Sequence, residues 1–147
     1  MAAGMTREER EAFLLDVHVG ILSIPDGHNG PFAVPIWYQY EPDADCIWMT
    51  TGRLSRKGQL LEKAQRISLC AHSEVPPYKY VSVEGPIVSI EPASTDKDTL
   101  RLAHRYLGVA AGNKYVAGMR TRMEEADPVL VRMRPERWRT FDPSKAR

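Results

Sequence analysis

One short segment concentrates side chains that could bind an anion. Residues 50–57 read Thr-Thr-Gly-Arg-Leu-Ser-Arg-Lys, and residues 55–63 have the composition of a short helix with Ser55 as its N-cap. A helix N-terminus presents unpaired backbone N–H groups and a partial positive charge. A hydroxyl, a guanidinium and an ammonium placed there would make a pocket suited to a doubly charged phosphate.

The same charges allow two plainer interpretations. Arg53, Arg56 and Lys57 place three cations within five residues, and such runs are commonly solvated surface loops. They could also form a patch that contacts nucleic acid. The chain as a whole argues against that patch, because 20 Lys plus Arg balance 19 Asp plus Glu to a net charge of +1. A net charge this close to zero creates no global field that would attract a polyanion, and we therefore expect no nucleic-acid partner.

Length and composition indicate an ordinary soluble protein. The chain has 147 residues, of which 43% are hydrophobic and 27% charged, and we expect residues 1–147 to form a single domain. No stretch approaches the roughly 18 apolar residues that span a membrane, and the first ten residues lack an apolar signal region. We therefore expect a cytoplasmic protein with no membrane partner. The four histidines and two cysteines show no metal-ligand spacing, so no metal site is expected.

The elements that must position residues 50–57 are mostly short strands. Helices are expected over 6–16, behind a Thr6–Glu9 capping box, and over 55–63. A third helix begins at Thr95, is interrupted at 108–113, and is followed by a shorter one through Tyr115 and Met119. Gly85-Pro86 suggests a bulge or bend. These elements predict an α+β fold, a closed or nearly closed barrel in mostly meander order, whose strands are expected at 19–24, 32–40, 46–51, 66–72, 80–90, 129–133 and 137–141.

The stretch from Ile47 to Leu69 resembles the pyridoxamine 5′-phosphate oxidase-like superfamily. It carries Thr-Thr-Gly-x-x-Ser-Arg-Lys, then a helix, then Arg-Ile-Ser-Leu, and the likeness extends over about residues 15–90. The resemblance implies an FMN-binding-like split β-barrel of six to seven mostly antiparallel strands with small flanking helices. It also implies a homodimer with the cofactor at the subunit interface. By this match the cofactor phosphate is held by Thr51, Ser55, Arg56 and Lys57, with Thr50 and Gly52 beside them.

Two further groups of residues follow from the resemblance. Pro35, Ile36, Trp37 and Tyr38 fall on the family strand whose backbone lines the flavin-type ring. Tyr78 and Tyr80 fall where the neighbouring subunit reaches the cofactor in this family. No carboxylate pair and no Ser/His/Asp set demands an acid–base role, so no catalytic side chain is assigned.

Departures from the family pattern indicate the reaction. True pyridoxamine phosphate oxidases carry an arginine–histidine pair near the C-terminus, whereas no histidine follows His104 here. The Pro-Ile-Trp-Tyr strand and the Trp-Arg-x-Phe-Asp ending are more similar to the actinobacterial branch that uses coenzyme F-420. The resemblance thus implies an F-420H2-dependent reductase that transfers a hydride between deazaflavin and a small organic acceptor. Tyr38, Tyr78 or solvent would supply the accompanying proton.

Two alternatives stay open at this point. The cofactor could be FMN, in which case the protein is an FMN-dependent oxidoreductase with the same phosphate site. The protein could also be a carrier without turnover that binds a flavin, a deazaflavin or a tetrapyrrole. Such a carrier would keep the phosphate ligands but lack a substrate cleft open above the ring.

Overall fold

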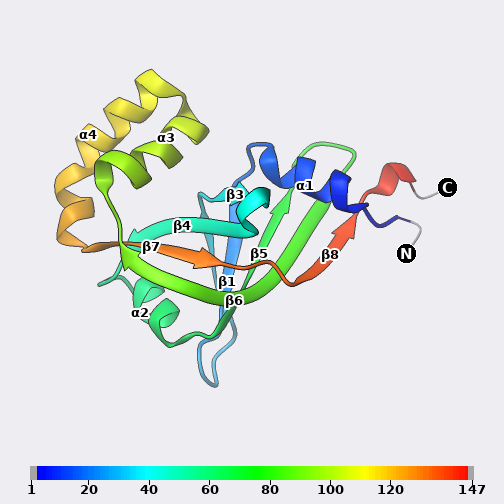
Figure 1. Ribbon diagram of the computed structural model, residues 1–147, viewed down its shortest axis with the longest axis horizontal. Helices are drawn as coiled ribbons and strands as arrows, with labels where there is room; N and C mark the ends of the chain where they lie inside the picture. The colour runs from blue at the N-terminus through cyan, green and yellow to red at the C-terminus, as the bar shows by residue number, and fades with distance from the viewer. Residues whose placement is uncertain (1–2, 146–147) are drawn as a thin grey trace.

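Eight strands form one antiparallel sheet that curls into a split barrel (Figure 1). The computed structural model describes residues 3–145. The strand order is β2-β1-β5-β6-β7-β4-β3, and β8 pairs with β6 outside that path. There is one strand more than the seven expected, because one predicted strand is divided into two, as described below. The strands are β1 Gly20–Ile24, β2 Phe32–Ile36, β3 Gln39–Glu41, β4 Cys46–Gly52, β5 Arg66–His72, β6 Tyr80–Pro92, β7 Pro128–Met133 and β8 Arg137–Phe141.

The long strand β6 joins the two halves of the barrel. Its first half pairs with β5 and β8, and its second half pairs with β7. The change of partner requires a glycine at position 85, because a Cβ there would overlap the carbonyl oxygen of Arg134. The register shift itself lies between Ile87 and Ser89, slightly later than the bulge expected at Gly85-Pro86.

The stretch 32–40 is two strands, and the expectation of a single strand there was wrong. Strand β2 ends at Ile36 and pairs with β1, whereas β3 begins at Gln39 and pairs with β4. The chain therefore passes from one edge of the curled sheet to the other between these strands. Alternating apolar residues show that a segment is extended but not which neighbour each half will pair with, so the sequence pattern could not reveal the division.

The helices confirm two expectations and correct a third. Helix α1 (Arg7–Leu15) begins with the expected capping box, and α2 (Arg56–Lys63) begins at the expected cap, Ser55. A π-helical turn, η2 (Thr95–Thr99), is capped by Ser94 and continues into α3 (Leu100–Leu107). Only Gly108, at φ 84°, separates α3 from α4 (Val109–Glu125), so the interruption expected over 108–113 was too long. Two short 3₁₀ turns complete the set, η1 (Pro42–Ala44) and η3 (Pro143–Lys145).

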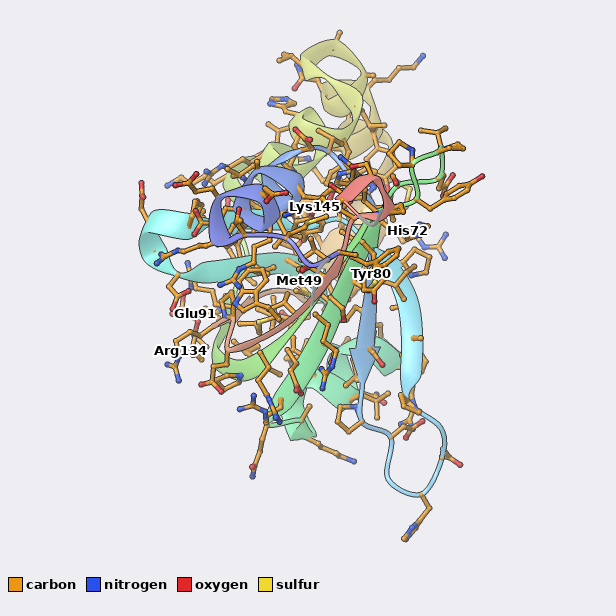
Figure 2. All side chains as sticks on the ribbon, turned by 90° about the vertical axis from the view of Figure 1, so that its right-hand side faces the viewer. Met49, His72, Tyr80, Glu91, Arg134 and Lys145 are labelled. Carbon is orange, nitrogen blue, oxygen red and sulfur yellow. The ribbon has the colours of Figure 1, made fainter. Side chains whose placement is uncertain are left out.

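Two apolar clusters support these elements. The larger fills the barrel interior, where Met49 lies at the centre of the molecule in Figure 2. The smaller contains Cys46, Trp48, Leu102 and Leu130 and joins α3 to the outer face of β4 and β7. Strand β4 is therefore buried on both faces, which explains its unbroken apolar run. Within residues 3–145, no helix is both long enough and apolar enough to cross a membrane.

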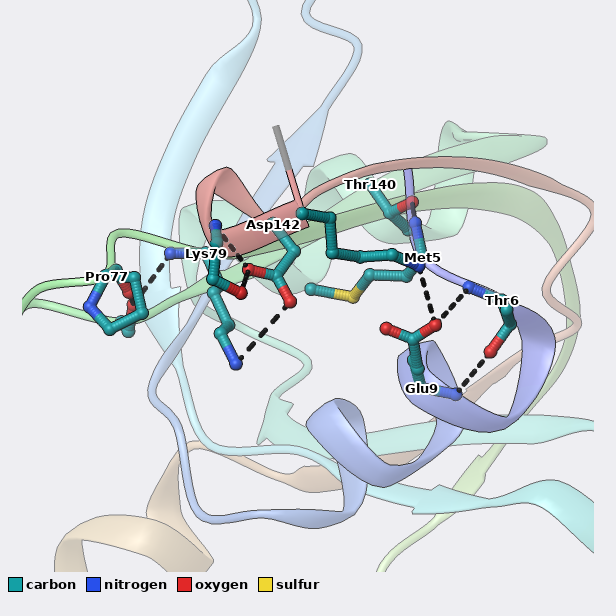
Figure 3. A network of polar contacts seen from close by, with 10 residues as sticks. Met5, Thr6, Glu9, Pro77, Lys79, Thr140 and Asp142 are labelled. Carbon is teal, nitrogen blue, oxygen red and sulfur yellow. Dashed lines mark hydrogen bonds and ion pairs between the residues drawn. The ribbon is translucent and has the colours of Figure 1, made fainter. Parts of the chain in front are cut away.

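The two ends of the described chain are tied together (Figure 3). The Met5 N–H donates to Oγ1 of Thr140 at 2.8 Å, and the Lys145 ammonium pairs with Glu9 at 2.8 Å. Beside them, Asp142 accepts from Ser144 at 2.6 Å and faces Lys79. These contacts fix α1 across one end of the barrel, at the side away from the α3–α4 hairpin in Figure 1.

Candidate functional site

A pocket of about 500 Å³ lies between the outer face of the barrel and the α3–α4 hairpin. Its volume is in the range of small-molecule and cofactor sites. The barrel side contributes Val19, Pro35, Ile36, Trp37, Thr50, Thr51, Gly52, Lys57 and Pro128, and the helical side contributes Thr99, Leu102, Tyr115, Met119, Arg122, Met123 and Ala126.

The end of β4 faces this pocket because of the strand's alternation. Cys46 and Trp48 pack beneath α3, and a period of two puts Thr50 on the same face. At the next outward position, Gly52, an added Cβ would lie 2.6 Å from the Cβ of Ala126. Strand and helix therefore meet here so closely that only glycine fits.

Helix α2 begins directly at this strand end. The Ser55 hydroxyl donates to the carbonyl of Gly52 at 2.6 Å and accepts the Gly58 N–H at 3.1 Å. Its only proton is thus engaged within the loop, and Ser55 does not line the pocket. In this arrangement the serine serves the helix as its cap, while the first turn of α2 presents its unpaired N–H groups beside Lys57.

Within residues 3–145, Lys57 is one of two cations that line the pocket, and Arg122 is the other. Burial lowers the pKa of the Lys57 ammonium below its ordinary value. Among the described residues, no carboxylate forms an ion pair with Lys57, and no aspartate or glutamate lines the pocket. Lys57 is half-buried, and a charge that is partly withdrawn from water normally has a partner. A cation, threonine hydroxyls and a helix N-terminus therefore fit the phosphate of a flavin-type cofactor.

The remaining predicted residues lie elsewhere. Arg56 turns outward and pairs with Asp26 at 2.8 Å. Tyr78 and Tyr80 are exposed, and the Tyr80 ring stacks on Phe141 at 6.0 Å. Figure 2, viewed from the right of Figure 1, shows Tyr80 on the side of the molecule away from α3 and α4. The structure thus brings seven of the predicted residues to one pocket, and Ser55, Arg56, Tyr78 and Tyr80 lie outside it.

After β2 the chain changes direction, and the side chains of two consecutive residues, Trp37 and Tyr38, lie on opposite sides of the sheet, one in the pocket and one in the core. Trp37 lines the pocket, whereas Tyr38 is fully buried in the core and donates its hydroxyl proton to the Leu14 carbonyl at 3.0 Å. Burial raises the pKa of Tyr38. Because Tyr38 does not reach the pocket, its expected role as a possible proton donor is wrong.

The contribution of α4 to the pocket was not predicted from the sequence. Tyr115, Met119, Arg122 and Met123 all line the pocket. Their spacing of four, three and one residues is that of one helical face, and this spacing could have indicated from the sequence that they lie together. It was overlooked because the interruption expected at 108–113 left too short a helix to present that face.

Comparison with known proteins gives a family match over nearly the whole chain. Residues 6–142 match the family model described as pyridoxamine 5′-phosphate oxidase. No curated protein gives a significant sequence match.

Several solved structures share the fold. The conserved hypothetical protein Rv2991 from Mycobacterium tuberculosis has a TM-score of 0.76 at 23% identity, over 98% of this chain and 89% of that one. An F420 reductase has a TM-score of 0.69 at 20% identity, with coverages of 88% and 94%. An FAD-binding protein from Mesorhizobium loti has a TM-score of 0.63 at 17% identity, with coverages of 92% and 94%. Since the family model spans nearly the whole chain, the protein belongs to the pyridoxamine 5′-phosphate oxidase family, which is named for an oxidoreductase.

Proposed function

We propose that this protein is an F-420H2-dependent reductase whose cofactor phosphate lies against Lys57, Thr50 and Thr51. The observation that carries the proposal is the Lys57 ammonium, which is directed into a pocket where no described carboxylate neutralises it. The structural likeness to an F420 reductase supports the choice of deazaflavin. The family of the chain supports the more general assignment to flavin-type oxidoreductases.

When bound, the reduced deazaflavin would supply a hydride, which together with one proton reduces an activated double bond of the acceptor. The chain's own residues bind and orient. Lys57, the threonine hydroxyls and the α2 N-terminus hold the anionic end. Pro35 and Ile36 line the pocket on the barrel side, and the α3–α4 hairpin covers the opposite side.

The proton is proposed to come from solvent. The pocket opens to the surface, and the only phenol among its described lining residues is Tyr115, which is exposed. No described lining residue is a carboxylic acid or a histidine. The chain is therefore assigned no catalytic acid, and its contribution is position and electrostatics.

FMN is the second candidate cofactor. The same cation and hydroxyls would accept its phosphate, and an FAD-binding protein is among the similar structures. The two candidates differ in the ring and in what is attached to the phosphate, and neither difference changes the role of Lys57.

We further propose that the protein acts as a homodimer. Tyr78 is 61% exposed and Tyr80 is 37% exposed, and both lie outside the pocket of their own chain. Exposed tyrosines at the end of a hairpin are suited to contact a partner surface, and in a dimer they would complete the partner's cofactor site. Light scattering at micromolar concentration should give twice the mass of one chain, and a monomer that binds cofactor fully would contradict this.

The test of function has two stages. The purified protein is titrated with oxidised coenzyme F-420 and, separately, with FMN, with quenching of tryptophan fluorescence as the signal because Trp37 lines the pocket. Oxidation of F-420H2 is then followed with a panel of quinones and enones. Micromolar binding of F-420 with turnover supports the proposal. A preference for FMN selects the second candidate, binding without turnover indicates a carrier, and binding of neither cofactor overturns the proposal.

A further inference from the structure

One face of α4 runs along the length of the pocket. Tyr115, Met119, Arg122 and Ala126 are spaced by four, three and four residues, so they lie on one side of the helix, and all of them line the pocket. At 1.5 Å per residue this face is roughly 16 Å long.

Both ends of this helical face are fixed against the barrel. At one end the Leu54 N–H donates to the Ala126 carbonyl at 3.2 Å, and Ala126 lies against Gly52. At the other end the Tyr115 and Trp37 rings are 5.3 Å apart. The α4 face is therefore the wall opposite the strands that are proposed to carry the cofactor.

The charges on α4 divide between this wall and the outside. Arg120 forms ion pairs with Asp96 at 2.5 Å and with Glu124 at 3.4 Å, and it does not line the pocket. Arg122 lines the pocket, and no ion pair with it is found among the described residues. The two arginines on this helix thus differ, because Arg120 is neutralised by carboxylates outside the pocket and Arg122 is left available to it.

Arg122 is itself exposed to solvent, and its neighbours on the pocket side are apolar. Met119 and Met123 flank it on the pocket side and are half-buried. Flexible thioether side chains adapt to flat ligands of various outlines. A guanidinium binds a carboxylate through two parallel hydrogen bonds.

We propose that Arg122 is a second anion-binding residue of this pocket, and that the acceptor is a flat, apolar molecule carrying a carboxylate that Arg122 binds. The anion site at Arg122 does not depend on the proposed function, whereas calling its ligand the acceptor rests on that function. Lys57, on α2, would take the phosphate of the cofactor, and Arg122, on the opposite wall, would orient the acceptor by its acid group while the methionines contact its apolar body.

A pair of dyes tests the anion site without any cofactor. The sulfonate 1-anilinonaphthalene-8-sulfonate and its neutral analogue N-phenyl-1-naphthylamine share one apolar body and differ by one negative charge. We expect Arg122→Gln to weaken binding of the sulfonate at least fivefold and to leave binding of the neutral dye within twofold. Arg120→Gln, on the same helix, should leave both unchanged. Equal effects of Arg122→Gln on the two dyes, no effect on either, or an equal effect of Arg120→Gln would overturn the proposal.

Experiments with F-420 then show whether the anionic group that Arg122 binds belongs to the acceptor or to the cofactor. If F-420 affinity in Arg122→Gln stays within twofold of the wild type, while kcat/KM for a carboxylate acceptor falls at least fivefold relative to its methyl ester, the group belongs to the acceptor. If F-420 affinity itself falls fivefold, the group belongs to the cofactor and the acceptor assignment is wrong. Failure of F-420 to bind the wild type would overturn the proposed function and the acceptor assignment, and would leave the dye result standing as evidence for an anion site.

Discussion

The rings of Trp37 and Tyr106 are stacked almost in parallel, with centroids 5.1 Å apart and planes 7° from each other. The Tyr106 hydroxyl donates to the His18 carbonyl at 2.6 Å and accepts the Tyr38 N–H at 3.1 Å. One side chain of α3 thus fixes the point where the chain leaves β2 and supports the tryptophan that lines the pocket. The position of Trp37 is determined from outside the barrel rather than from its core.

Tyr106→Phe should destabilise the protein because two partly buried backbone groups lose their partner while the stacked ring is kept. The expected loss is about 2 kcal/mol in the free energy of unfolding, measured by urea denaturation followed by circular dichroism. Tyr115→Phe is the matched control, since Tyr115 is exposed and makes no hydrogen bond with the described residues, and it should change stability by less than about 0.5 kcal/mol. Equal effects of the two substitutions would refute this role of the hydroxyl.

Two glycine-to-alanine substitutions should change the free energy of unfolding in opposite directions. Both glycines are in helices, but a Cβ at Gly58 would overlap the Gly52 carbonyl oxygen, whereas a Cβ at Gly118 would meet open space. Gly58→Ala should therefore destabilise by about 1–3 kcal/mol. Gly118→Ala should stabilise by about 0.5–1 kcal/mol through helix propensity. Thermal melts of the two variants suffice, and a stabilising Gly58→Ala would show that α2 does not pack against the end of β4 as described.

His18 should make stability depend on pH. Burial, the largest cause, lowers the pKa of His18, and its Nε2 atom is buried with no partner among the described residues. Above the unfolded value of about 6.5 the ring is neutral in both states. Below it the unfolded chain takes up a proton before the folded chain does, so the free energy of unfolding falls with falling pH until the lower folded pKa is passed. The slope between pH 7 and pH 5 should be smaller in His18→Gln, and identical slopes would exclude the effect.

Lys57 should be unfavourable for stability in the absence of a ligand. Its ammonium is half-buried and its pKa is lowered by burial alone. Lys57→Met removes this desolvated charge and keeps a long apolar side chain. The free energy of unfolding should then stay equal or rise by up to about 0.5 kcal/mol, as determined by urea denaturation. A clear loss of stability would mean that the lysine has a structural partner in solution.

The sequence predicted most of the fold because local signals agree with tertiary ones in most elements. The Thr6–Glu9 capping box begins α1, and Ser55 begins α2. Prediction from the sequence failed where the structure of a segment depends on partners that are distant in the chain. The division of 32–40 follows from pairing with β1 on one side and β4 on the other, and no spacing within the segment reports that.

The candidate site shows the same limit. The segment around Thr51 and Lys57 is contiguous, so its composition suggested an anion site and the family resemblance favoured that interpretation over a solvated loop, and the structure places both residues in one pocket. The wall built by α4 begins about fifty residues after Lys57, and tertiary contacts such as those of Ala126 with Gly52 and of Tyr115 with Trp37 bring it there. Ser55 illustrates a different limit, because one hydroxyl can serve as helix cap or as ligand and its type does not say which.

The central claim is that Lys57 binds the phosphate of coenzyme F-420, and a matched pair of lysines on α2 tests it most directly. Lys57 lines the pocket, whereas Lys63 lies exposed at the other end of the same helix. Fluorescence titration with oxidised F-420 should show Lys57→Met binding at least tenfold more weakly than the wild type, a change of about 1.4 kcal/mol, with Lys63→Met within twofold. Equal affinity of the wild type and both variants would contradict the account.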